Sequence, residues 1–204
     1  MFWVIGGVLL TAAVLSGPIA SDVEQAKYEI VEKHEKIELR KYQPMIIAEV
    51  EVTGERKEAI NKGFKLIADY IFGNNTSSQK IAMTAPVVQN QSEKIAMTAP
   101  VVQENISDQL WKVHFVMPAS YSIETLPRPN NNSVKLKPIE SKKFAVIRFS
   151  GMAGNESIES HTLELKKFIT DNNLTPKSLP IYAFYNPPWT LGFLRRNEIM
   201  LELE

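Results

Sequence analysis

The chain contains no cysteine, which excludes disulfide bonds, thiolate metal sites and a cysteine nucleophile. It also has no excess of charge of either sign, because 23 basic side chains stand against 23 acidic ones. Proteins that bind nucleic acids generally carry a surplus of lysine and arginine. The composition therefore predicts no nucleic-acid partner, and the 204 residues are enough for one domain with a substantial core.

Catalytic motifs are absent as well. The sequence has no Gly-x-Ser-x-Gly, no phosphate-binding glycine loop and no zinc-binding His-Glu-x-x-His. The three histidines, His34, His114 and His161, show no ligand-like spacing, and His114 is expected on the polar face of a strand. No carboxylate stands in an apolar run that would raise its pKa for acid catalysis. We therefore predict a protein that is not an enzyme and has no catalytic or metal-ligating residue.

The longest apolar run occupies the N-terminus, where residues 2–15 are interrupted only by two glycines and a threonine. Extended to Ala20, the run is long enough for a bilayer core of about 30 Å at about 1.5 Å per helical residue. A cleaved signal peptide normally has a basic start and a small-x-small cleavage site, which Pro18-Ile19-Ala20 fits poorly. The pattern favours an uncleaved anchor over a signal peptide.

These observations divide the chain into a hydrophobic membrane anchor or signal segment at 1–20, a linker at 21–27 and one domain at 28–204. We expect the domain outside the cytoplasm, tethered to the membrane through residues 2–20. If the segment is cleaved, the domain is expected to be periplasmic or secreted.

A ten-residue repeat follows the first predicted helix. Lys80-Ile81-Ala82-Met83-Thr84-Ala85-Pro86-Val87-Val88-Gln89 returns letter for letter at residues 94–103. One interpretation is a local duplication that forms a hairpin, with residues 90–93 as its turn. The other is that Met83 and Met97 line an adaptable apolar groove. The proline in each copy favours a sheet edge or a bulge over a central strand.

The remaining pattern predicts strands and two amphipathic helices. Apolar residues alternate along 37–39, 46–52, 111–117, 134–136, 144–149, 181–185 and 198–203, as in half-buried strands. Spacings of three and four from Ile60 to Ile71 and from Ile158 to Ile169 predict helices, the second capped by Asn155. The order of elements repeats, which indicates an α+β fold of two pseudo-symmetric halves with a mainly antiparallel sheet.

Aromatic residues surround a Pro-Pro turn near the C-terminus, between Tyr182 and Trp189, and Arg195 and Arg196 follow. These residues could shape a connection whose aromatic rings pack into the core, with one arginine paired to Glu198. They could instead form a flat apolar pocket with a cationic rim that suits a planar ligand bearing carboxylates.

Several motifs together resemble the SOUL heme-binding family, and the resemblance runs from about Tyr28 to Glu204. The motifs are Ile37-Glu38-Leu39-Arg40-Lys41-Tyr42, the two Lys-Ile-Ala-Met-Thr-Ala-Pro copies, Phe115-Val116-Met117-Pro118, Tyr185-Asn186-Pro187-Pro188 and Arg195-Arg196-Asn197-Glu198. Two copies of the Met-Thr-Ala-Pro motif are similar to the bacterial type of this family. The family comparison makes the repeat a signature of the fold, with its methionines in core packing.

The resemblance implies a distorted antiparallel β-barrel of two pseudo-symmetric halves with two helices. It also implies non-covalent binding of heme or another porphyrin at a hydrophobic surface groove, as a carrier, buffer or sensor. The groove would involve the exposed flank of the first helix, where Phe64, Ile67 and Ala68 fall at the matching places. An alternative function is a module that binds another hydrophobic ligand or a protein partner.

The basic residues implied for the heme propionates are Lys41, Arg195 and Arg196. In vertebrate members for which axial ligation has been proposed, a histidine lies between the Arg and the Tyr of the first motif, and Lys41 stands there in this chain. An ammonium group must lose its proton before it can bind iron. We therefore expect heme to be held by apolar contact and propionate pairing, without a protein ligand to the iron.

Overall fold

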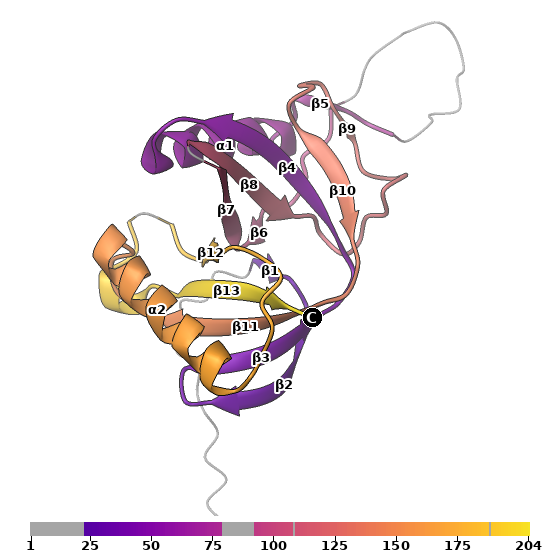
Figure 1. Ribbon diagram of the computed structural model, residues 1–204. Coiled ribbons are helices and arrows are strands. Elements are labelled where there is room, and N and C mark those ends of the chain that lie inside the picture. Colours follow the sequence, from indigo (N-terminus) through magenta and orange to yellow (C-terminus); the bar gives the residue numbers. More distant parts are fainter. Residues whose placement is uncertain (1–22, 79–91, 108, 188) are drawn as a thin grey trace, which may run out of the picture.

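A computed structural model of the chain describes residues 23–78, 92–107, 109–187 and 189–204 (Figure 1). Within these ranges there are two α-helices, a short 3-10 helix and thirteen strands. Their bounds are β1 Glu24–Gln25, β2 Tyr28–His34, β3 Ile37–Tyr42, β4 Met45–Thr53, α1 Arg56–Ile71, β5 Asn75–Thr76, β6 Thr98–Ala99, β7 Val101–Ser107, β8 Leu110–Val116, β9 Arg128–Pro129, β10 Lys135–Ile139, β11 Lys142–Phe149, α2 Asn155–Asp171, β12 Ile181–Phe184, η1 Gly192–Leu194 and β13 Asn197–Leu203.

Nine strands form one curled antiparallel sheet in the order β10-β4-β8-β7-β12-β13-β11-β3-β2. The predicted two-half architecture is confirmed, because β4, β8 and β7 in the first half correspond to β11, β13 and β12 in the second. The halves meet where β7 pairs with β12. They also exchange a strand, since β3 precedes β4 in the chain but pairs with β11, while β10 precedes β11 but pairs with β4.

Each helix covers the outer face of its own half (Figure 1). Alternate residues of β4 and β8, such as Val50 and Val113, pack against the apolar stripe of α1. In the second half, residues such as Ile147 and Ile199 pack against α2. The other set of alternating residues faces the concave side of the sheet, where a third cluster of buried side chains joins the halves. Two outer cores and one inner core therefore hold the half-barrel together.

Gly63 sets the distance between α1 and the sheet. A Cβ atom at this position would lie 2.7 Å from Cγ2 of Val113 and 3.3 Å from Cγ2 of Val50. Only a residue without a side chain lets the helix backbone approach β4 and β8 this closely.

The second copy of the repeat lies in the described part of the chain, whereas the first copy, and with it the predicted hairpin, falls outside it. The sheet-edge expectation is wrong for the second copy, because β7 is a central strand between β8 and β12. Pro100 stands between β6 and β7, so its missing N–H removes no hydrogen bond from the ladder. The expectation that the methionines of the repeat pack in the core is also wrong for Met97, which is 38% exposed. Ile95 of the same copy is buried instead.

Two local predictions also need correction. The cap of α2 is Gly154, and Asn155 is the first helical residue. The prolines and three consecutive asparagines between residues 125 and 133 predict a loop, but this segment contains the short strand β9, which pairs with β5. Among the described residues, none of the helices is long and apolar enough to cross a membrane.

Candidate functional site

An open groove separates the start of α1 from the exposed face of α2. It has a volume of about 490 Å³, within the range of about 300–1,000 Å³ typical of small-molecule sites. Its lining residues are Arg56, Asn105, Asn155, Ile158, Glu159, Thr162, Leu163, Lys166, Leu179, Pro180 and Tyr182. We call it the α2 groove.

Large apolar side chains reach solvent in the α2 groove. Leu163 is 60% exposed and Leu179 is 56% exposed, and they come from α2 and from the segment before β12. Ile158, one turn before Thr162 on α2, is buried and forms the floor beside the ring of Tyr182. Exposed leucines that line a concave surface indicate a site for an apolar ligand.

Arg56, the first residue of α1, supplies the positive charge of the groove. Its Nη2 donates to Oε1 of Gln103 at 3.4 Å, and its guanidinium lies 5.5 Å from the ring centroid of Tyr182. Its Nε is buried and has no hydrogen-bond partner in the described part of the chain. Burial lowers the pKa of Arg56, while Tyr182 opposes the shift.

No described carboxylate lies within 4.0 Å of the Arg56 guanidinium. Partial burial of a cation without an opposite charge has a free-energy cost unless something else compensates it. An anionic ligand group in the groove would supply that compensation, since a guanidinium binds carboxylates bidentately. Lys166 adds a second, exposed cation to the groove, and Glu159 adds one exposed carboxylate.

The residues predicted on α1 do not share an exposed flank. Phe64 is 37% exposed and its ring lies 5.5 Å from that of Phe115. Ile67 is fully buried and Ala68 is 9% exposed, so both belong to the face of α1 that packs on the sheet. The helical period that puts Phe64 at the edge of the apolar stripe puts Ile67 and Ala68 near its centre. Of the three, Phe64 alone presents an accessible ring.

The predicted basic residues lie in the other half of the molecule and are not among the residues that line the α2 groove. Lys41 is exposed on β3, where it pairs in register with Lys143 and Glu29. Arg195 follows η1 and its Nε donates to the carbonyl oxygen of Thr190 at 2.8 Å. The structure therefore does not bring the six predicted site residues together.

Arg196 belongs to a buried ionic network on the concave face. Glu198 is fully buried and accepts from Arg40 at 2.9 and 3.0 Å and from Arg196 at 2.9 Å. The hydroxyl of Tyr185 donates to the same carboxylate at 2.7 Å. Burial by itself raises the pKa of Glu198, but the hydrogen bonds and charges of the two arginines outweigh it and lower that pKa. For Arg196, the interpretation as a structural partner of Glu198 is confirmed.

The three histidines lie apart. His34 is exposed and contacts Glu32, and the ring of His161 stacks on Phe149 at 4.1 Å. His114 lies, as expected, on the face of β8 opposite Trp111, Val113 and Phe115, but the curl of the sheet covers this face, so the ring lines an inner cavity. No group of three or more metal-ligating side chains occurs among the described residues.

Comparison with known proteins gives a consistent result. A sequence model of the SOUL heme-binding protein family matches residues 23–92 and 88–202. Heme-binding protein 1 of Xenopus laevis is 26% identical over 191 residues, which cover 91% of this chain and 95% of that protein.

Two solved structures share the fold. The C-terminal domain of EcmrR superposes with a TM-score of 0.56 at 11% identity, covering 87% of this chain and 98% of that one. A hydrolase from Listeria innocua superposes with a TM-score of 0.54 at 13% identity, covering 85% and 94%. At these identities the likeness concerns the fold alone. The match of the family model over nearly all of the described sheet and both helices shows that the chain belongs to the SOUL heme-binding protein family.

Proposed function

We propose that this protein binds heme non-covalently in the α2 groove. The observation that carries the proposal is the half-buried guanidinium of Arg56, whose Nε has no hydrogen-bond partner among the described residues, which pairs with no described carboxylate, and which lines a groove with exposed leucines. A porphyrin offers the matching chemistry, since its macrocycle is flat and apolar and its propionates are carboxylates. The family and the related frog protein support heme as the ligand.

In this arrangement the macrocycle lies against Leu163 and Leu179, and one propionate pairs with Arg56. Lys166 meets the second propionate or the solvent-facing edge of the ligand. The described residues that line the groove include no histidine, cysteine or methionine, and burial raises the pKa of Tyr182, so that its phenol is neutral near pH 7 and a poor iron ligand. The protein therefore binds the porphyrin through its apolar faces and its carboxylates, and leaves the iron without a strong protein ligand.

The groove is open at the surface, so bound heme stays accessible to other molecules. Such a site suits a protein that buffers heme or hands it on, because release needs no unfolding of the core. The two Met-Thr-Ala-Pro copies support assignment to the bacterial type of the family.

Titration of the full chain with hemin, followed by Soret absorbance, tests the cationic part of the site. Arg56→Gln is expected to weaken binding by about tenfold or more, because it removes a charge-assisted bidentate contact. The matched control is Arg148→Gln, which removes an exposed guanidinium on β11 outside the groove. Equal affinities for the two variants would refute the role of Arg56.

A second pair of variants tests the apolar wall. Leu163→Asp puts a charge on the exposed face of α2, and Leu191→Asp makes the same change at a side chain of similar exposure outside the groove. Neither side chain is buried, so both variants are expected to keep the parent's unfolding midpoint within a few degrees. Only Leu163→Asp should lose hemin binding.

We also propose that residues 2–20 tether the heme-binding domain to a membrane and place it outside the cytoplasm. The apolar length of this segment supports the proposal. Expression of the full chain, fractionation and carbonate extraction test it, and the mass of the product distinguishes an anchor from a cleaved signal. Recovery of the intact 23.0 kDa chain in the soluble fraction would contradict the tether.

A further inference from the structure

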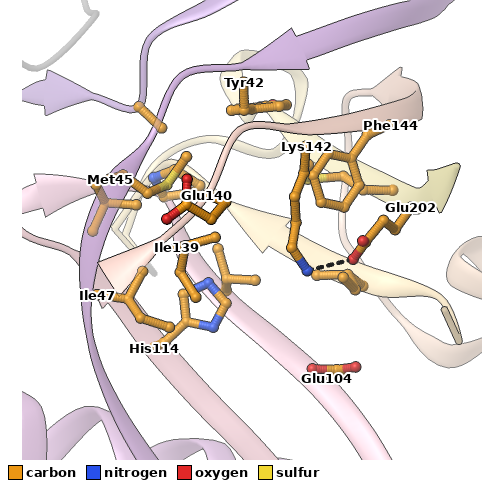
Figure 2. A pocket seen from close by; sticks show the side chains of 16 residues that line it. Tyr42, Met45, Ile47, Glu104, His114, Ile139, Glu140, Lys142, Phe144 and Glu202 are labelled. Atoms are coloured by element: carbon orange, nitrogen blue, oxygen red, sulfur yellow. Dashed lines mark hydrogen bonds and ion pairs between the residues drawn. The ribbon is translucent and has the colours of Figure 1, made fainter. Parts of the chain in front are cut away.

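A cavity distinct from the α2 groove lies on the concave face of the sheet, between the two halves (Figure 2). Its volume is about 150 Å³, close to that of the cavity in which a protein core binds benzene. Its walls are mainly apolar and come from strands of both halves, among them Ile47 on β4, Val102 on β7, Val116 on β8, Phe144 on β11 and Met200 on β13. The cavity is too small for a porphyrin and has room for a ligand of about one ring.

The charged groups of the cavity carry an excess of negative charge. Glu104, Glu140 and Glu202 line it together with one cation, Lys142. The ammonium of Lys142 lies 2.6 Å from Glu202, so these two charges compensate each other (Figure 2). Glu104, which stands opposite Lys112 of β8 in register, and the exposed Glu140 make no ion pair within 4.0 Å among the described residues, and they favour a ligand that brings a positive charge.

Glu104 is one polar group of the cavity that has no hydrogen-bond partner within the described ranges. It makes no hydrogen bond and no ion pair within 4.0 Å among the described residues, although it is half-buried on a central strand. Burial raises the pKa of Glu104, and the charges of Lys112 and Lys142 oppose the shift. A partly desolvated carboxylate without a donor is an acceptor site that a ligand can fill.

His114 is the second such group. It pairs in register with Glu49 on β4 and with Val102 on β7, and its ring projects into the cavity (Figure 2). Burial lowers the pKa of His114 to about 4, against the pull of Glu49, so the ring is neutral near pH 7 and keeps one acceptor nitrogen. The imidazole has no hydrogen-bond partner in the described part of the chain.

The two groups are neighbours on one face of the sheet. Glu104 is two residues beyond Val102 on β7, and Val102 is the residue opposite His114. This diagonal relation separates their Cα atoms by about 7–8 Å. A small donor group placed between them can reach both acceptors, while an apolar ring occupies the space beside Ile47 and Val102.

We infer that this cavity binds a small organic cation, with a one-ring apolar body and an ammonium group that donates hydrogen bonds to Glu104 and to the imidazole of His114. This site is independent of the proposed heme groove. An anion of the same size would face Glu104 and Glu140, neither of which has an ion pair within 4.0 Å among the described residues, and a neutral hydrocarbon would leave Glu104 and His114 unpaired.

Calorimetric titration of the full chain at pH 7.5 with benzylamine, toluene and benzoate tests the inference. Benzylamine is expected to bind, toluene more weakly, and benzoate not at all. Glu104→Gln should weaken benzylamine binding by about 10- to 100-fold, because it removes a charge-assisted hydrogen bond, and should leave toluene binding unchanged. The matched control is Glu51→Gln, which removes an exposed carboxylate of β4 outside the cavity.

A second measurement reports on the cavity directly. Addition of benzylamine should shift the NMR signals of the His114 ring and leave those of His34 in place. Absence of benzylamine binding at millimolar concentration would overturn the inference, as would binding of benzoate with equal affinity or an equal loss in the two glutamine variants. Glu104→Gln should keep full hemin affinity and Arg56→Gln should keep full benzylamine affinity. The experiments can therefore refute one proposed site without refuting the other.

Discussion

His114 makes the stability of the fold depend on pH in a window where few other groups titrate. Burial inside the sheet lowers its pKa from 6.5 to about 4, and among its charged neighbours Glu49 opposes this shift while Lys112 and Lys142 add to it. The unfolded chain therefore binds a proton at this residue at a higher pH than the folded chain does. Its stabilising contribution is complete above pH 6.5 and is lost as the pH falls from 6.5 towards 4.

The size of the effect follows from the two pKa values. Each tenfold change in proton affinity corresponds to about 1.4 kcal/mol, so the full loss is about 3 kcal/mol, most of it complete by pH 4.5. Urea unfolding of the full chain at pH 7.5 and pH 4.5 measures it. From pH 7.5 to pH 4.5, the free energy of unfolding of His114→Gln should fall by about 2–3 kcal/mol less than that of the parent. This expectation does not depend on the stability of the variant at pH 7.5.

The comparison has a control in His34→Gln, which removes an exposed imidazole. The free energy of unfolding of this variant should change between the two pH values by the same amount as that of the parent. If the parent and His114→Gln lose equal free energy on acidification, His114 is not held neutral by burial, and the description of the inner cavity is wrong.

Three further predictions concern the core and the ionic network. Glu198→Gln leaves the guanidinium groups of Arg40 and Arg196 without their common carboxylate, and should lower the free energy of unfolding by about 3–5 kcal/mol in urea titration. Because the pKa of Glu198 is lowered in the folded state, the parent should lose this stabilisation as the pH falls below about 4.5, and the variant should lose less there. Gly63→Ala should cost about 1–3 kcal/mol despite the better helix propensity of alanine, since the new methyl group meets Val113 at 2.7 Å, and thermal unfolding measures this cost.

Matched controls separate these effects from a general response to substitution. Glu159→Gln removes an exposed carboxylate on α2, and Lys62→Ala changes the residue before Gly63 on the solvent side of α1. Both should stay within about 0.5 kcal/mol of the parent. If Gly63→Ala raised the free energy of unfolding, or if Glu198→Gln left it unchanged, the contacts described for these residues would not be the ones that stabilise the fold.

The fold could be predicted largely because its elements have strong periodicity. The alternation along 46–52 and 144–149 and the helical spacing from Ile60 to Ile71 each reflect one face packed on a core. The order of the elements then revealed the two halves. The exchange of β3 and β10 between the halves could not be predicted, because strand pairing depends on the whole sheet and leaves no local pattern.

The site was harder to predict for a related reason. Arg56 is a single charged residue at the start of a helix, and no pattern in the adjacent sequence predicts that its guanidinium lies beside the ring of Tyr182. Alternation correctly put His114 and Glu198 on the face of the sheet opposite the helices, but a curled sheet buries both faces. Alternation assigns a polar residue to a face of the sheet, but it does not predict that the curl of the sheet covers that face.

The central claim is that heme is held through its apolar faces and its propionates, without a strong protein ligand to the iron. Parallel titrations of the full chain with hemin and with metal-free protoporphyrin test it most directly. We predict affinities of the same order for the two ligands, both weakened in Arg56→Gln. A sharp low-spin Soret band with hemin, lost in Lys41→Ala or His34→Ala and accompanied by no binding of the metal-free porphyrin, would contradict the claim.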